Sequence, residues 1–170
     1  VHDRTSGVAS FVAGDEEEAE ALAAELLAFL PDHTDDHPPT IASADPVERP
    51  TPDAYEVLPP SANGSYDVRD IVGAVVDDGY LLEPHANWAA NLVTAFATIG
   101  GQPVGIVANQ PQTVAGTLDI PASQKGGRFV ALCDVTRSTF RSSRLSTRRA
   151  STPARTPNCL LYTSDAADEV

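Results

Sequence analysis

The sequence has no long apolar run. Its longest apolar stretches, such as Ile71 to Val76 and Val104 to Ala108, are far shorter than the ~20 residues that cross a bilayer. No charged segment followed by an apolar one opens the chain at Val1, so a signal peptide is not expected either. We therefore predict a cytoplasmic protein. Apolar residues still make up 42% of the 170 residues, which is enough for a packed core.

Basic residues are scarce. Eleven lysines and arginines stand against 24 aspartates and glutamates, and the net charge is −13. A surface this acidic repels phosphate groups, so neither a nucleic acid nor a membrane is expected as a partner. The charge also changes sign within the chain. Residues 1–135 hold 21 acids and 5 bases (net −16), whereas residues 136–170 hold 3 acids and 6 arginines (net +3).

The apolar residues of 136–170 follow neither a helical nor a strand period. One interpretation is a basic, disordered tail, which the composition favours. A second follows from the genetic code, because a shifted reading frame over Arg137 to Pro153 can encode FDIPLLTFVDTPGFHA, a buried-strand pattern followed by a turn. The string CLLYTSDAADE, Cys159 to Glu169, resembles a translated sequencing adapter. We therefore predict that residues 136–158 are frameshifted and that residues 159–170 derive from an adapter.

Cysteine is almost absent as well. With Cys159 in the predicted adapter, Cys133 is the one cysteine of residues 1–135, so no disulfide is expected and a reducing cytosol fits. No histidine lies near Cys133 in sequence, which favours a small buried side chain on a helix over a nucleophile. The string KGGR, Lys125 to Arg128, has neither the spacing of a P-loop nor a strand before it, so no phosphate site is predicted.

Two helices are predicted to begin at capping aspartates. Asp15, with Glu18 three residues later, starts an amphipathic helix that runs to about Leu30. Asp67 starts a second helix, whose apolar stripe ends near residues 77–79. The two carboxylates at that end are expected to be solvated at the surface.

The strand pattern is concentrated in two places. Val8 to Val12 predicts a short strand, and the β-rich runs Leu92 to Ile99 and Pro103 to Ala108 are separated by three residues that predict a tight hairpin. A final helix is expected over Ser123 to Asp134. The residues expected to face inward from it are Phe129, Val130 and Cys133.

Residues 32–66 are rich in proline and polar residues without a sustained period, as expected of an extended linker. Four of them have metal-ligand chemistry, but the two prolines that follow break the helix on which they would share a face, so no metal site is predicted. These four are His33, Asp35, Asp36 and His37.

Several strings resemble a known family. In chain order, DPVERP, YDVRDIVGAVVDDG, VGIVANQP and AGTLDIPASQKGGRFVALCD are similar to the carboxyltransferase (β) subunit of biotin-dependent acyl-CoA carboxylases, and most like its propionyl-CoA carboxylase branch. SGVASFVAGDEEEAEALAAELLAFLP, Ser6 to Pro31, resembles the end of that subunit's N-terminal half. One departure is Gly126 and Gly127, where the family usually has two alanines.

The resemblance implies an α/β chain with a crotonase-like fold, a spiral of ββα units. Residues 1–31 would end the N-terminal carboxyltransferase domain, residues 32–66 would link the domains, and residues 67–135 would begin the C-terminal domain. The implied reaction moves a carboxyl group from carboxybiotin to the α-carbon of a short-chain acyl-CoA, with propionyl-CoA favoured. Biotin would arrive on a separate carrier domain. The implied partners are a biotin carboxylase or biotin carrier subunit and further copies in a hexamer-type assembly.

The resemblance also bears on the site residues. The family's two oxyanion holes would lie before Val1 and beyond Val135, so no catalytic residue is assigned. Asn109, Gln110 and Pro111 are expected to line the biotin-side cleft. An internal fragment of this kind is expected to be inactive by itself and to fold poorly. Two alternatives stay open: a biotin-dependent decarboxylase or transcarboxylase subunit of the same fold, and a non-catalytic acidic interaction domain with a basic disordered tail.

Overall fold

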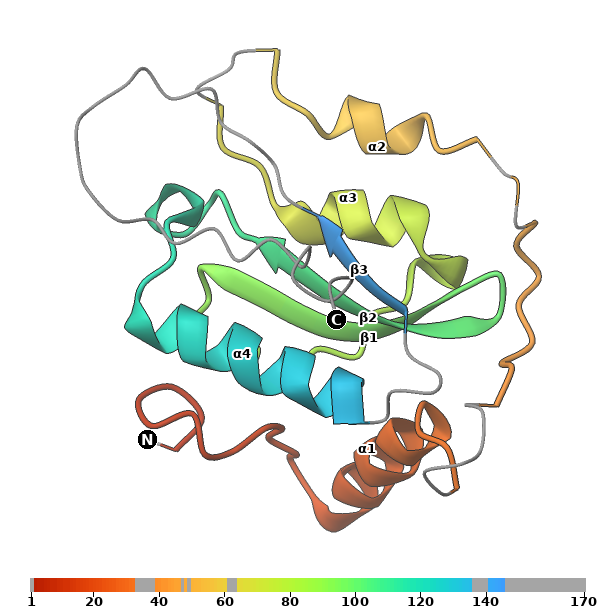
Figure 1. The fold of residues 1–170 in the computed structure, drawn as a ribbon, viewed down its shortest axis with the longest axis vertical. Coiled ribbons are helices and arrows are strands. Elements are labelled where there is room, and N and C mark those ends of the chain that lie inside the picture. Colours follow the sequence, from red (N-terminus) through yellow and green to blue (C-terminus); the bar gives the residue numbers. More distant parts are fainter. Residues whose placement is uncertain are drawn as a thin grey trace, which may run out of the picture.

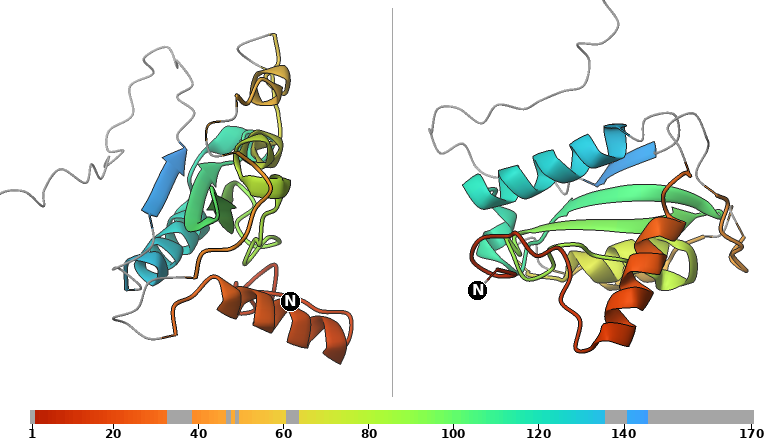
Figure 2. Two further views of the ribbon diagram at one scale, coloured as in Figure 1. Left: turned by 90° about the vertical axis from the view of Figure 1, so that its right-hand side faces the viewer. Right: turned by 90° about the horizontal axis from the view of Figure 1, so that it is seen from below.

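The computed structural model describes residues 2–32, 39–46, 48, 50–60, 64–135 and 141–145. A three-stranded sheet of order β1-β2-β3 lies at the centre, with helices α3 and α4 on opposite faces of its first two strands (Figures 1 and 2). The elements of this unit are α3 (Val68–Val75), β1 (Leu92–Ile99), β2 (Gln102–Asn109), α4 (Ile120–Val135) and β3 (Arg141–Leu145). Among the described residues, no helix combines the length and the apolar content that a bilayer crossing requires.

The predicted hairpin is confirmed. β1 and β2 pair antiparallel, from Leu92 opposite Asn109 to Ile99 opposite Gln102. Gly100 and Gly101 form the turn with φ values of 59° and 75°. A two-residue turn with two positive φ angles matches the twist of the strands, and glycine adopts it without a steric cost. The second strand exceeds its predicted range by one residue at each end.

The hairpin is buried on both faces, as the nearly continuous apolar run of β2 predicts. Alternate residues face opposite sides, so each face has its own cluster. Toward α3 lie Val93, Ala97, Val104, Ile106 and Ala108, packed against Val68, Val72 and Val76. The other cluster contains Phe29, Leu82, Phe96, Phe129 and Cys133. The loop before β1 and the turn after β2 are therefore attached to a packed centre.

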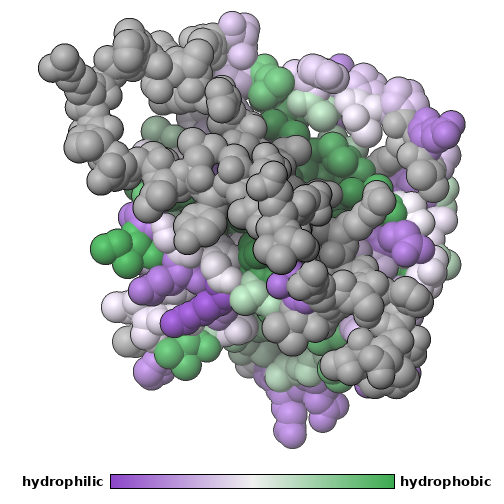
Figure 3. Space-filling model, viewed as in Figure 1, coloured by the Kyte–Doolittle hydropathy of each residue, from purple (hydrophilic) through white to green (hydrophobic). Residues whose placement is uncertain are grey.

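Helix α1 (Glu16–Ala28) confirms the predicted cap. Asp15 accepts a hydrogen bond from the N–H of Glu18 at 2.9 Å, and the Glu18 carboxylate accepts one from the N–H of Gly14 at 2.6 Å. The lower end of the molecule, where α1 begins, is hydrophilic in Figure 3. No residue of α1 is buried, although Leu22 and Leu26 pack against the Phe29 cluster.

The strand predicted at Val8 to Val12 is wrong. These residues join no sheet, and Val8 and Val12 are 73% and 63% exposed. The segment instead packs beside the loop before β1, where the N–H of His85 donates to the carbonyl of Ser10 at 2.7 Å. The segment from Val8 to Val12 has a strand-like composition, but among the described residues its hydrogen-bonded neighbour is the loop at His85 rather than a strand edge.

Helix α3 begins at its predicted cap, Asp67, which accepts from the N–H of Arg69 at 2.9 Å. It is followed by η1 (Asp77–Gly79), and here the expectation of two solvated carboxylates is half wrong. Asp78 is exposed, but Asp77 is only 5% exposed and accepts from the N–H groups of Gly100 and Gly101 at 3.0 and 2.7 Å. The Asp77 side chain therefore holds the hairpin turn.

Besides η1, two more short helices accompany the central unit. One is α2 (Asp53–Glu56), a single turn within the predicted linker, and the other is η2 (Val114–Gly116), after β2. The linker also reaches the hairpin, because the N–H of Ile41 donates to the carbonyl of Gly101 at 2.9 Å. The four linker residues with metal-ligand chemistry lie outside the described residues. Within the described part, no group of three or more potential metal ligands occurs.

Helix α4 begins at Ile120, three residues before its predicted start. Phe129 and Cys133 face inward as expected, but Val130 is 38% exposed, so its predicted inward position is wrong. The buried face instead includes Ala122 and Lys125, which lie on the Phe129 side of the helix. Beyond α4, strand β3 pairs parallel with β2, whereas the rest of the predicted frameshifted and adapter segments lies outside the described residues.

We expect Gly127→Ala to raise the free energy of unfolding by about 0.5–1 kcal/mol, because glycine costs that much relative to alanine inside a helix. A Cβ at Gly127 meets no atom within 4 Å. The matched control is Gly126→Ala, whose Cβ would lie 2.9 Å from Leu92 Cδ2 and would require that side chain to move. Urea titrations should rank the 127 variant above the 126 variant, and the reverse order would contradict the packing described.

Candidate functional site

Asn109, Gln110 and Pro111 form one turn where the chain leaves β2. Strand pairing stops here because Pro111 has no N–H to donate. The N–H of Gln110 donates instead to the carbonyl of Asn91 at 2.9 Å, and the N–H of Thr113 donates to the carbonyl of Gln110 at 3.1 Å. The structure thus brings the three residues together, and their part in lining a biotin-side cleft stays a prediction.

The side chain of Gln110 is buried, and both ends of its amide are used. It is 2% exposed; Nε2 donates to Asp67 Oδ1 at 2.6 Å, and Oε1 accepts from the N–H groups of Val68 and Gln112, both at 3.3 Å. A buried amide with partners on both sides fixes the turn against the start of α3. Gln110 therefore positions the turn, while Asn109 is half-buried beside it.

A chain of charged side chains runs from this turn to α4. Arg69 donates two hydrogen bonds to Glu83, at 2.7 and 3.0 Å, and its Nη1 lies 3.4 Å from Asp67 Oδ1. Hydrogen bonding to Glu83 raises the pKa of Arg69. Partial burial opposes ionisation of Asp67, but hydrogen bonds from the Arg69 N–H and the Gln110 amide outweigh it and lower the pKa of that carboxyl. At the far end, Lys125 Nζ lies 3.9 Å from Glu83 Oε1.

The ammonium group of Lys125 is buried in the second turn of α4. Its side chain is 0% exposed, and Nζ donates to the carbonyl oxygens of His85, Trp88 and Leu92 at 2.9, 3.1 and 2.8 Å. Each of the three N–H groups of the ammonium thus has a carbonyl oxygen as its acceptor. Burial lowers the pKa of Lys125 to about 8, so the group is still largely charged at neutral pH. Lys125 therefore ties residues 85–92, the loop before β1, to α4.

The turn continues into a strained segment held by two asparagines. All three residues of η2 have positive φ values, 49°, 54° and 71°, of which the first two belong to non-glycine residues. Asn109 Nδ2 donates to the carbonyl of Gly116 at 3.0 Å, and Asn91 Nδ2 donates to the carbonyl of Thr117 at 2.7 Å. Asn91 also lies 3.2 Å from Asp119 Oδ1. These side chains fix a backbone conformation that its residues would not adopt alone.

Large apolar side chains stand exposed beside the strained segment. The exposed fractions are 69% for Val114, 50% for Leu118 and 75% for Ile120. Hydrophobic surface is visible at the edge of the molecule where α4 begins (Figure 3). Apolar groups exposed together mark a surface on which a ligand or a partner can pack.

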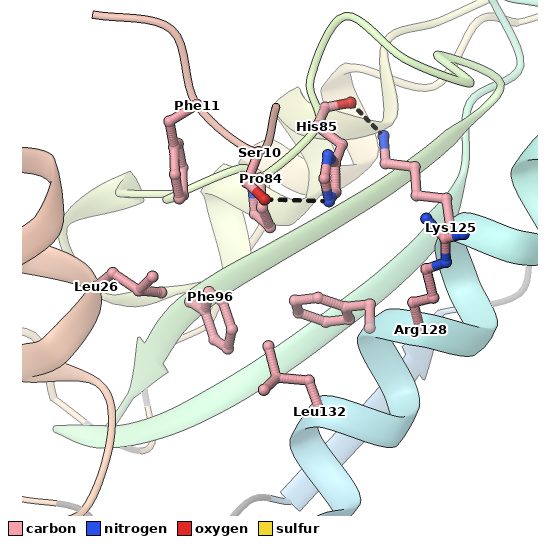
Figure 4. A pocket seen from close by; sticks show the side chains of 10 residues that line it. Ser10, Phe11, Leu26, Pro84, His85, Phe96, Lys125, Arg128 and Leu132 are labelled. Atoms are coloured by element: carbon pink, nitrogen blue, oxygen red, sulfur yellow. Dashed lines mark hydrogen bonds between the residues drawn. The ribbon is translucent and has the colours of Figure 1, made fainter. Parts of the chain in front are cut away.

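A pocket of about 130 Å³ lies on the other side of the hairpin, between α1, α4 and β1 (Figure 4). Apolar side chains form most of its wall, and polar side chains gather at one end. The lining residues are Ser10, Phe11, Leu26, Pro84, His85, Phe96, Lys125, Arg128, Phe129 and Leu132.

The polar end of the pocket contains a serine and a histidine in contact. Ser10 Oγ lies 3.3 Å from His85 Nε2, and His85 Nδ1 lies 3.1 Å from the carbonyl oxygen of Ala9. His85 has a φ of 58°, which turns its backbone so that its carbonyl meets Lys125. The pair joins the N-terminal segment to the loop before β1.

Cys133 has the surroundings of a structural residue. It is buried in the Phe129 cluster, and burial raises the pKa of its thiol to about 11. A thiol with this pKa holds its proton at neutral pH, so it is a poor nucleophile. This agrees with the interpretation from sequence. Lys125 to Arg128 lies inside α4 rather than in a loop between a strand and a helix.

Sequence reasoning missed the buried positions of Asp77 and Lys125, the two charged residues that are buried in the described part of the chain. One feature of the sequence could have drawn attention to Lys125, since it is the only lysine in a segment with 21 acids. No feature of the sequence indicates the role of Asp77, because its partners are backbone groups 23 and 24 residues away. His85 likewise meets Ser10 from 75 residues away.

Comparison with known protein families gives a match over most of the chain. The carboxyl transferase domain model matches residues 1–138. The 12S subunit of methylmalonyl-CoA carboxyltransferase from Propionibacterium freudenreichii is 43% identical over 133 residues, 78% of this chain and 25% of that protein. The carboxyltransferase subunit of propionyl-CoA carboxylase from Haloferax mediterranei and the methylmalonyl-CoA decarboxylase α subunit from Veillonella parvula are each 41% identical, over 78% of this chain and 26% of theirs. The chain thus spans about a quarter of the length of these relatives.

Solved structures give the same result. A structure of transcarboxylase 12S with hydrolysed methylmalonyl-coenzyme A bound has a TM-score of 0.77 and 39% identity, and the match covers 85% of this chain and 29% of that one. A single-chain, multi-domain long-chain acyl-CoA carboxylase has a TM-score of 0.69 and 28% identity, over 87% of this chain and 14% of that one.

Proposed function

Because this chain belongs to the carboxyl transferase domain family, we propose that it is part of the carboxyltransferase subunit of a biotin-dependent acyl-CoA carboxylase. Its crotonase-like fold, present as a partial domain, is that of transcarboxylase 12S. The proposed reaction moves a carboxyl group from carboxybiotin to the α-carbon of a short-chain acyl-CoA. The observation that carries the proposal is the joint agreement of sequence and backbone, 39% identity at a TM-score of 0.77 over 85% of the chain.

Propionyl-CoA is the proposed acceptor. Relatives at 41–43% identity are named for propionyl-CoA or for methylmalonyl-CoA, which is propionyl-CoA with one added carboxyl group. A decarboxylase or transcarboxylase subunit is a second candidate, because the methylmalonyl-CoA decarboxylase and carboxyltransferase relatives are as similar to this chain as the carboxylase. The candidates share the transfer between biotin and the acyl-CoA and differ in where the carboxyl group goes next.

The turn after β2 offers a hydrogen-bond donor and apolar side chains, the two kinds of group that biotin needs. The ureido oxygen needs a hydrogen-bond donor, and Asn109 Nδ2 has a second hydrogen besides the one on the Gly116 carbonyl. The apolar ring needs apolar surface, and Val114 and Leu118 are exposed beside the turn. Biotin would supply the carboxyl group in transit. We infer that Asn109 and Pro111 line its cleft and that Gln110 holds them in place.

We also propose the wider assembly. A biotin carboxylase or biotin carrier subunit would deliver the carboxyl group, since a relative from Mycobacterium tuberculosis is named as the β5 subunit of a biotin-dependent carboxylase. A hexamer-type assembly is proposed because the 12S structure describes hexamer assembly. Residues 1–31 and 67–135 would then belong to the two carboxyltransferase domains, joined by residues 32–66.

A chimera tests the function. Residues 1–135 would replace the matched 133 residues of the Propionibacterium 12S subunit, and carboxyl transfer from methylmalonyl-CoA to free biotin would be measured. Because the backbone of this chain matches that of transcarboxylase 12S with a TM-score of 0.77 over 85% of its residues, we expect activity within about tenfold of the parent. Size-exclusion chromatography would confirm that the chimera assembles as the parent does.

One outcome of the chimera experiment contradicts the proposed function. It is an assembled chimera that turns over propionyl-CoA and methylmalonyl-CoA at background rates.

A variant of the chimera tests the site. Asn109→Ala should lower kcat/KM for biotin by about tenfold or more, as expected for loss of a donor to a carbonyl. An unchanged value would remove Asn109 from the biotin cleft. Gln112→Ala, in the same turn, is the matched control.

A further inference from the structure

The pocket between α1, α4 and β1 combines an apolar wall with a polar end. Phe96 and Phe129 lie with ring centroids 4.9 Å apart, and Leu26 and Leu132 complete the wall from α1 and α4 (Figure 4). Arg128 and His85 stand at the polar end. The pocket therefore has the layout of a site for a small molecule with one apolar and one polar end.

The charge of the lining points to an anion. The chain carries a net charge of −13, yet the ten lining residues contain no aspartate or glutamate and include Arg128 and Lys125. Lys125 uses its ammonium hydrogens on three backbone carbonyls, so Arg128 supplies the available positive charge. Its guanidinium carbon lies 5.9 Å from the Trp88 ring centroid, which leaves the N–H edge of the group for an acceptor.

We propose that this pocket binds a short-chain monocarboxylate of four to six carbons. Its carboxylate would be held by Arg128 with His85 beside it, and its alkyl tail would lie against Phe96, Phe129 and Leu26. The inference goes beyond the proposed function and does not depend on it. The volume of about 130 Å³ sets the length, since a cavity of roughly 150 Å³ accommodates benzene.

The geometry disfavours other small ligands. A phosphate ester needs several donors around three oxygens, whereas two parallel N–H groups of one guanidinium match the two oxygens of a carboxylate. A wholly apolar ligand would gain nothing from the guanidinium of Arg128, which is an exposed residue at the polar end. A cation would meet Arg128 at the polar end of the pocket.

Binding is measured directly on the 170-residue chain. Pentanoate is titrated while the fluorescence of Trp88, the only tryptophan, and the amide signals of residues 85–88 in a ¹H–¹⁵N spectrum are followed. We expect saturable binding with a Kd of about 1 mM, as suits seven heavy atoms. Pentan-1-ol, which has the same tail without the charge, should bind at least ten times more weakly.

Two variants locate the site and one serves as a control. Arg128→Gln keeps the helix and removes the charge, and should raise the Kd about tenfold. Leu132→Glu, one helical turn later and 46% exposed, should abolish binding because its carboxylate would pair with Arg128. Arg4→Gln, an exposed arginine beside Asp3, should leave the Kd unchanged. Each variant's spectrum reports whether it is folded like the parent.

The proposal is overturned if pentanoate produces no saturable shift up to about 20 mM in the folded chain. It is equally overturned if pentan-1-ol binds as tightly as pentanoate, or if folded Arg128→Gln and Arg4→Gln have the same Kd. Phosphate binding better than pentanoate would replace a carboxylate site with a phosphate site and would also contradict the inference.

Discussion

Replacing Lys125 with methionine should lower the free energy of unfolding by about 3 kcal/mol or more. Methionine matches the length of the stem but donates no hydrogen bond, so the carbonyl groups of His85, Trp88 and Leu92 lose their shared donor. A buried acceptor left without its donor costs about 1–3 kcal/mol. The loss of the ammonium desolvation cost offsets part of this sum. Urea titration followed by Trp88 fluorescence measures the change.

The control is the neighbouring residue on the same helix. Gln124 is exposed, so Gln124→Met should change the free energy of unfolding by less than about 0.5 kcal/mol. A second readout separates the proposed role from a general packing defect. Amide exchange in residues 85–92 should accelerate more than exchange in β2, because Lys125 anchors that loop. Uniform acceleration, or a Lys125→Met variant as stable as Gln124→Met, would contradict the anchoring role.

The same lysine gives a pH dependence whose sign follows from its pKa. Burial places the pKa of Lys125 at about 8, below the ~10.4 of an exposed lysine in the unfolded chain. Between these values the folded state binds fewer protons than the unfolded state, so this group makes the free energy of unfolding rise with pH. Below about pH 8, Lys125 is protonated in both the folded and the unfolded state, so it does not change the free energy of unfolding with pH.

The measured quantity is the difference between the parent and Lys125→Met. Cys133 and Tyr80, whose pKa values burial raises to about 11 and about 12, act in the opposite direction in both proteins and cancel. We expect the stability gap between parent and variant to widen by roughly 1–3 kcal/mol from pH 7 to pH 10. A gap that narrows with pH would mean that the three carbonyls, with Glu83, raise the pKa of Lys125 instead.

The elements that sequence predicted are those whose determinants are local. Asp15 and Asp67 cap helices through N–H groups two or three residues away, and Gly100 with Gly101 supplies the two positive φ angles of the hairpin turn. The nearly continuous apolar run of β2 indicated that this strand is buried on both faces. Such signals lie within a few residues of one another, so a single chain shows them.

The errors involve partners that lie far along the chain. Val8 to Val12 has strand composition, but its neighbour is the His85 loop rather than a strand edge. Val130 was assigned inward by position, whereas the buried face of α4 turns toward Lys125, because the loop before β1 offers three carbonyls there. Sequence spacing alone carries no information on where such groups meet.

In the candidate site, too, the sequence indicated some residues and only the fold shows the others. The turn at Asn109, Gln110 and Pro111 was found through resemblance, since nothing in its local pattern names a ligand. Gln110 is held by Asp67, 43 residues earlier, and by Asn91, the residue before β1, and only the fold shows these contacts. The pocket at Arg128 is assembled from the N-terminal segment, α1, β1 and α4, so no contiguous motif indicates it.

Asp77→Asn should lower the free energy of unfolding by about 2–3 kcal/mol. The carboxylate of Asp77 is 5% exposed and accepts from Gly100 and Gly101 at 3.0 and 2.7 Å. An asparagine keeps one acceptor and turns an NH₂ group toward the other N–H, so one buried donor loses its partner and meets a second donor. Charge-assisted bonds of this kind are about twice as strong as neutral ones.

The adjacent residue provides the test of this argument. Asp78→Asn removes the same charge at an exposed position. Asparagine tolerates the φ of 53° found there, so the free energy of unfolding should change by less than about 0.5 kcal/mol. Thermal unfolding of the two variants in parallel removes the common effect of net charge. If Asp77 acts through the turn, amide exchange at Gly100 and Gly101 accelerates in Asp77→Asn and not in Asp78→Asn. Equal stability of the two variants would show that the hairpin turn holds its shape through its glycines alone.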